Sequence, residues 1–199
     1  MSVVSPATAA APVADPFPGY IPTAGRYDEY RAPDGSVRPP WAEFFRLLGP
    51  NAPATLRAAH AACQRSIVEQ DVSMNVYDGQ RSGAQIWPLD VVPLLVAADD
   101  WALLSDGLRQ RARLLNDLLR DLYGPQKLLR SGSLPAALAL ANPQFLRPCV
   151  GLGRESEVML HTYAVDLARS PDGRWWVLRD RLDAPSGLGY SLQNRILTR

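Results

Sequence analysis

The sequence predicts an α+β protein, helical in its first half and completed by an antiparallel hairpin near its end. Apolar residues recur at helical spacing in several stretches between residues 41 and 141. Residues 158–180 then form two strand-like segments around Ser170-Pro171-Asp172-Gly173, a strong turn signal. The change from helical to strand periodicity places the hairpin after the helices.

The first forty residues are rich in Ala and Pro, and such a composition offers little apolar surface for packing. Residues 1–40 are therefore expected to be a disordered or weakly extended lead-in, in which Tyr20, Tyr27 and Tyr30 at most dock locally. The segment lacks the early basic residues and uninterrupted apolar run of a secretory signal. Folded structure is expected from Trp41 onward.

Four helices follow from apolar periodicity and from Gly-Pro pairs that end a helix. They are expected at residues 41–48, 53–70 with Asn51 as N-cap, 99–123 and 134–141. An early hairpin is expected where residues 75–77 and 84–87 flank Asp78-Gly79. The later hairpin pairs residues 158–167 with 174–180.

The composition limits the classes of function that the chain can have. The 199 residues carry a net charge of +1, which gives no electrostatic footprint for nucleic acid or an anionic membrane surface. The sequence contains no apolar run long enough to cross a membrane. The two cysteines, Cys63 and Cys149, have no zinc-ligand spacing, so reduced thiols and a cytoplasmic location are expected.

The chemistry is expected at the end of the last strand. Trp175-Trp176-Val177-Leu178 is followed by Arg179, Asp180 and Arg181, which are the candidate catalytic residues. The alternative is a solvated strand end followed by an ordinary loop.

Asp166 and Asp180 carry the carboxylate oxygens that hard cations prefer, and the family resemblance given below implies that they are candidate metal ligands. The hairpin turn brings them close in the ladder, but a change of one residue in register decides whether they share a face. If they share a face with Arg179 or Arg181, the alternative to a metal or phosphate site is a salt-bridge cluster.

An anion pocket is the second possibility, because arginines grip carboxylates and phosphates in a bidentate way and turns expose backbone donors. Its candidate substrate-binding residues are Ser186, Gly187, Asn194, Arg195 and Lys127, together with Arg179 and Arg181. The alternative treats Pro185-Ser186-Gly187 as a plain turn, and Arg195 and Lys127 as solvated charges.

Several segments in a fixed order carry a resemblance to a known family. They are WPLDVVP at 87–93, Trp101, GLRQR at 107–111, Leu115-Asn116, LYGPQK at 122–127, Asp166-Leu167, VLRD at 177–180, APSG at 184–187 and YSLQNR at 190–195. Over about residues 70–199 the chain resembles the N-terminal part of the circularly permuted ATP-grasp family, type-2 branch.

The resemblance implies that residues 41–199 are the N-terminal segment of a circularly permuted ATP-grasp domain, a partial and fragment-like one. It also implies an ATP-dependent carboxylate-amine ligase that uses ATP and Mg²⁺ on a small peptide-like or carboxylate substrate. The remainder of the ATP-grasp protein, in the same or another chain, would then be the partner that supplies most of the nucleotide cleft.

The sequence departs from this family at two positions. Many members carry Val-Leu-Glu-Asp-Asn where this chain has Val177-Leu178-Arg179-Asp180-Arg181. A guanidinium offers only hydrogen-bond donors and repels a cation, so Arg179 and Arg181 cannot hold Mg²⁺. The alternative function is a catalytically degenerate scaffold or a peptide- or anion-binding module.

Overall fold

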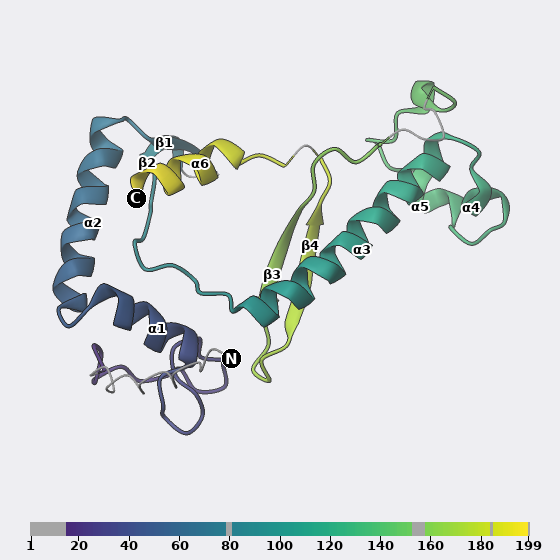
Figure 1. The fold of residues 1–199 in the computed structure, drawn as a ribbon. Coiled ribbons are helices and arrows are strands. Elements are labelled where there is room, and N and C mark those ends of the chain that lie inside the picture. Colours follow the sequence, from purple (N-terminus) through teal and green to yellow (C-terminus); the bar gives the residue numbers. More distant parts are fainter. Residues whose placement is uncertain (1–14, 79–80, 153–157, 184, 199) are drawn as a thin grey trace, which may run out of the picture. The chain divides into compact units, whose positions relative to one another are not determined.

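The computed structural model describes residues 15–78, 81–152, 158–183 and 185–198. The chain divides into two compact units, the first formed by residues 1–96 with 187–199 and the second by residues 97–186. Helices and two small antiparallel hairpins make up the described elements, which confirms the α+β class (Figure 1).

Helices α1 (Pro39–Leu48) and α2 (Ala52–Glu69) lie in the first unit, close to the predicted ranges. Proline is tolerated at the start of α1 because its missing N–H group would have no helical partner there. Gly49 follows α1 at φ +83°, a left-handed conformation that favours glycine. Asn51 occupies the predicted N-cap position of α2, but its side chain makes no capping hydrogen bond.

An aromatic cluster forms the core of the first unit. Tyr30, Trp41 and Phe45 are buried together with Ala52. Trp41 and Phe45 stack with ring centroids 5.8 Å apart, and the Tyr30 ring meets the edge or face of each at 5.9 Å. Such pairs stabilise the core beyond the area that they bury.

Residues 15–40 depart from the expected disordered lead-in, whose residues 1–14 lie outside the described part of the chain. The Asp28 carboxylate orders this segment by accepting hydrogen bonds from the backbone N–H of Tyr30 (2.9 Å) and of Arg31 (2.6 Å). It also accepts one from the hydroxyl of Tyr20 at 2.5 Å. The composition argument weighed the prolines but underestimated the aromatic rings, whose burial offsets the cost of ordering the chain.

The early hairpin is confirmed as β1 (Ser73–Asp78) paired antiparallel with β2 (Arg81–Ile86). Helix α6 (Leu188–Leu197) belongs to the same unit. The ring of Tyr190 on α6 stacks on Trp87 with centroids 4.2 Å apart, and its hydroxyl donates to a backbone carbonyl of β1 at 2.8 Å. These contacts dock α6 on the base of the hairpin.

Helix α3 (Ala98–Tyr123) is the longest described element and opens the second unit. Leu104 and Leu122 are its buried residues, and Asp99 and Asp100 lie in its first turn, where the helix dipole favours negative charge. The predicted helix at 99–123 is confirmed.

Three short helices follow: α4 (Lys127–Arg130), α5 (Ala136–Leu140) and the 3₁₀ helix η1 (Arg147–Cys149). Asp121 of α3 caps α4, since its carboxylate accepts hydrogen bonds from the backbone N–H of Lys127 (2.8 Å) and of the next residue (2.9 Å). The predicted helix at 134–141 is present over a shorter range.

The later hairpin pairs β3 (Ala164–Arg169) with β4 (Trp175–Arg181). β3 begins six residues after residue 158, where the first strand was predicted to start. Val165 lies opposite Asp180 and Asp166 opposite Arg179, whereas Leu167 lies opposite Val177. Leu178 is therefore an extra residue in β4, which forms a β-bulge.

The bulge decides which side chains face α3. Strict alternation along β4 would put the side chain of Asp180 on the same face as that of Trp176. The inserted residue instead puts Asp180 on the face that carries Trp175 and Val177, and these three residues are half-buried. Arg169 on the same face bonds Asp100 of α3 and lies over the Trp175 ring at 4.4 Å. On the other face the side chains of β4 are exposed, whereas those of β3 are half-buried.

Among the described helices, none is both long enough and apolar enough to span a membrane.

Candidate functional site

A pocket of about 400 Å³ lies where β4 ends, and we call it the arginine pocket. Its lining residues are Arg179, Asp180, Arg181, Leu182, Asp183, Pro185 and Ser186. The strand holds the first three, and the proline-containing loop brings Ser186 to the same pocket. Four predicted site residues therefore come together in a cavity of a size typical for small ligands.

Asp180 contributes to the pocket wall while its carboxylate is bound on the α3 side. Nε and Nη2 of Arg111 donate to its two oxygens, each at 2.7 Å, and the hydroxyl of Tyr163 donates to it at 2.6 Å. The guanidinium and then the phenol stabilise the charged form, which lowers the pKa of Asp180 to about 2. Burial and the hydrogen bond to Asp180 raise the pKa of Tyr163 to about 12.

Asp166 lies on the opposite face of the hairpin, where it is half-buried. Nε of Arg181 donates to its two oxygens at 3.0 and 3.1 Å, and Nη2 donates at 2.8 Å. This hydrogen bonding from Arg181, together with the nearby charge of Arg179, keeps the pKa of Asp166 below its usual value. The pair is the surface salt bridge that the sequence left as an alternative.

The register answers the question of whether Asp166 and Asp180 form a metal site. Because Asp166 is opposite Arg179 while Asp180 is opposite Val165, the two carboxylates project from opposite faces. Each is already neutralised by a guanidinium. No cluster of three His, Cys, Asp or Glu side chains suited to a metal occurs among the described residues. The residues of this hairpin therefore do not fit a Mg²⁺ site.

Arg179 differs from its neighbours because its guanidinium has no ion-pair partner among the residues that the structure describes. Both Arg179 and Ser186 are exposed. The arginine pocket thus presents one uncommitted guanidinium and one hydroxyl, which are donors for a carboxylate or phosphate. The exposed carboxylate of Asp183 also lines the pocket.

The remaining predicted residues have different surroundings. Asn194 lies on α6 in the first unit, where its Oδ1 accepts a hydrogen bond from Trp87 Nε1 at 2.8 Å. Arg195 on the same helix is exposed. Gly187 immediately precedes α6 at φ +108°. Lys127 begins α4 with an exposed side chain. Their predicted role in substrate binding stays a prediction.

The sequence indicated the role of two residues that support the site less clearly. Arg111 belongs to the quoted GLRQR segment, and in the structure it holds Asp180. Asn116 similarly braces the second unit, because its Oδ1 accepts hydrogen bonds from the backbone N–H of Met159 and Leu160. Tyr163 was missed, since a lone tyrosine before a strand carries no spacing signal.

Comparison with known proteins places the chain in a family. The sequence profile of the circularly permuted ATP-grasp type 2 proteins matches residues 93–199, more than half of the chain. The chain belongs to the circularly permuted ATP-grasp type 2 family. The matched range contains the arginine pocket and Arg111.

Similar proteins are considerably longer. An uncharacterised protein of Synechocystis is 36% identical over 169 residues, which are 85% of this chain and 35% of that protein. An uncharacterised protein of Mycobacterium tuberculosis is 36% identical over 182 residues, 87% of this chain and 20% of its own length. One of Mycobacterium leprae is 33% identical over 169 residues, 85% of this chain and 29% of its own. The chain thus spans about a third or less of the length of these relatives.

Proposed function

We propose that this chain is the N-terminal part of an ATP-dependent carboxylate-amine ligase of the circularly permuted ATP-grasp type. Membership of the family supports the reaction class. The greater length of the relatives supports a protein in which other segments supply most of the nucleotide cleft. ATP and Mg²⁺ would then be held by those segments, because the hairpin does not fit a metal site.

The observation that carries the role of this chain is the exposed guanidinium of Arg179 in the arginine pocket, which forms no ion pair with any residue that the structure describes. In the proposed function this pocket holds an anionic group of the substrate, a carboxylate or a phosphate. Arg179 supplies charge and a forked set of donors, and Ser186 adds a hydroxyl donor. Arg111 and Tyr163 act indirectly, because they fix Asp180 and thereby the end of β4.

Inorganic phosphate is a simple probe of this anion role. We expect Arg179→Gln to weaken phosphate binding to the full-length protein about tenfold, since a charged donor pair is lost. Arg174→Gln is the matched control, because Arg174 is exposed in the turn of the same hairpin and pairs with Asp172. Isothermal titration calorimetry measures both. Equal affinities for the two variants would contradict the anion role of Arg179.

A catalytically degenerate binding module is the second candidate function. It is favoured by the separation of Asp166 and Asp180, each of which is paired with an arginine. The double variant Arg179→Glu, Arg181→Asn restores the oxygen groups common in the family. A large gain in Mg²⁺-dependent nucleotide binding would support degeneracy, whereas loss of native activity would support a role for the arginines in the ligase.

A further inference from the structure

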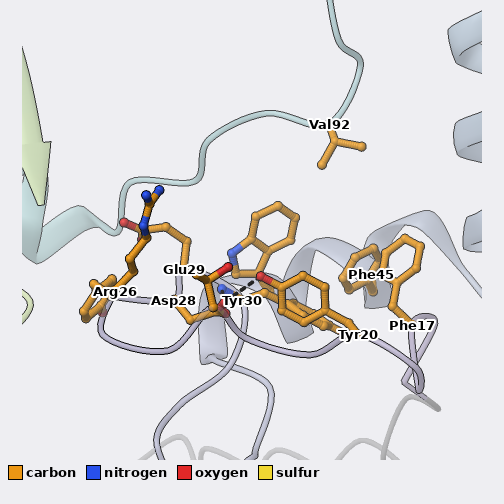
Figure 2. Close-up of a pocket in the computed structure, with 11 residues that line it drawn as sticks. Phe17, Tyr20, Arg26, Asp28, Glu29, Tyr30, Phe45 and Val92 are labelled. Atoms are coloured by element: carbon orange, nitrogen blue, oxygen red, sulfur yellow. Dashed lines mark hydrogen bonds between the residues drawn. The ribbon is translucent and has the colours of Figure 1, made fainter. Parts of the chain in front are cut away.

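A second cavity, which we call the aromatic pocket, lies entirely in the first unit and plays no part in the proposed function. Its volume is about 480 Å³, within the range of small-molecule sites. Six rings line it: Phe17, Tyr20, Tyr27, Tyr30, Trp41 and Phe45. Figure 2 shows Val92 across the pocket from the ring of Tyr20. The aromatic pocket is thus lined mainly by aromatic rings, with the aliphatic side chain of Val92 opposite Tyr20.

The charged lining of the aromatic pocket is predominantly acidic. Asp28 and Glu29, both half-buried, line it together with a single cation, Arg26. The carboxylate of Asp28 is held in place by two backbone N–H groups and by the hydroxyl of Tyr20, as Figure 2 shows for the latter. These hydrogen bonds also lower the pKa of Asp28, although burial opposes them. The negative charge is therefore fixed beside the rings.

Rings of this pocket already accept cations from the chain itself. The guanidinium carbon of Arg38 lies 4.2 Å from the centroid of the Tyr27 ring. That of Arg31 lies 5.4 Å from the centroid of the Tyr30 ring. Both distances fall within the range of cation–π attraction, in which the negative face of a ring stabilises a positive charge. Aromatic faces combined with the fixed carboxylate of Asp28 favour a cation over a neutral or anionic guest.

We propose that the aromatic pocket binds a small organic ammonium ion, with its alkyl groups against the rings and its charge near Asp28 and Glu29. The proposal is independent of the ligase function, because it rests on residues 17–45 and Val92 and not on the family-matched arginine pocket. Fixed carboxylates would stabilise the charge, and ring faces would replace part of its hydration shell.

Three probes of one shape test the preference for positive charge on the full-length protein. They are choline, its neutral isostere 3,3-dimethylbutan-1-ol, and the anion 3,3-dimethylbutanoate. We expect choline to bind about tenfold more tightly than the alcohol, since cation–π attraction and the carboxylates act only on the ammonium. The anion should not bind. Calorimetry that shows no choline binding, or equal affinities for choline and the alcohol, would overturn the proposal.

Two variants locate the site. Glu29→Gln should weaken choline binding severalfold, whereas the control Glu69→Gln, which removes the same charge at the exposed end of α2, should leave it unchanged. Val92→Phe should abolish binding by filling the pocket, and because Val92 is 38% exposed the larger side chain need not disturb the core. Choline binding that survives Val92→Phe would place the ammonium site elsewhere. The comparison of the three probes uses the unmodified protein and does not depend on either variant folding.

Discussion

Asp180 was predicted to be a catalytic residue, but in the structure its carboxylate has a structural role. Its position at the end of a strand suggested chemistry, but no spacing in the sequence pointed to its partner Arg111, 69 residues earlier. In the fold, Arg111 and Tyr163 use both of its oxygens on the face that points to α3. The carboxylate therefore holds the wall of the arginine pocket in place.

The lowered pKa of Asp180 predicts a pH dependence of stability. Because its folded pKa of about 2 lies below that of an unfolded aspartate, its contribution is present above about pH 4. That contribution is lost as the pH falls through the folded pKa. We expect the free energy of unfolding to fall less steeply between about pH 4 and pH 2 in Asp180→Asn than in the native chain. Urea denaturation across this pH range measures it, and identical slopes would contradict the ion pair.

Tyr163→Phe tests the phenol that supports Asp180. The variant removes a hydrogen bond to a carboxylate in a half-buried setting, so we expect a loss of about 1 kcal/mol in the free energy of unfolding. Tyr123→Phe is the control, because the Tyr123 hydroxyl accepts only a longer bond of 3.2 Å from a neutral backbone N–H of Leu146. A loss no larger than that of the control would show that the Tyr163 bond is unimportant.

At the scale of elements, α3 is the support on which the second unit is assembled. Its first turn bonds Arg169, its middle bonds Asp180, and its side chain at Asn116 holds the segment that leads to β3. The last of its turns caps α4 through Asp121. One long helix thus positions both strands of the hairpin that lines the arginine pocket.

Asn116→Ala tests this support. The change leaves the backbone N–H groups of Met159 and Leu160 without their acceptor, which costs about 1–3 kcal/mol. Asn116→Asp keeps an oxygen in place and should restore much of the loss. Asp117→Ala is the adjacent control and should cost only a few tenths of a kcal/mol, since Asp117 makes an exposed i,i+3 pair. Equal effects at positions 116 and 117 would contradict the bracing role.

Most elements were predictable because their signals are local. Apolar periodicity and Gly-Pro pairs located α1, α2, α3 and α5 within a few residues, and turn residues located both hairpins, whereas α4 and α6 were not predicted. The face of Asp180 was not predictable, because it depends on the extra residue Leu178, which leaves no mark in the alternation of side chains. Packing of residues 15–40 was also missed, since it depends on contacts between Tyr30 and the rings of α1.

At the scale of the whole molecule, some of the predicted site residues lie together, while their roles stay predictions. Arg179, Asp180, Arg181 and Ser186 line one pocket, as their closeness in sequence suggested. The strand register places the carboxylates of Asp166 and Asp180 on opposite faces of the hairpin, although the two residues are close in the ladder. The family resemblance recognised in the sequence is confirmed by the profile match over residues 93–199.

The proposed ligase function requires ATP, so binding of ATP by the full-length protein tests it most directly. Titration of the full-length protein with ATP, with and without Mg²⁺, should show saturable binding that requires the metal, accompanied by formation of ADP when a carboxylate and an amine substrate are supplied. A full-length protein that neither binds nor hydrolyses ATP under these conditions would contradict the ligase and leave an anion-binding module.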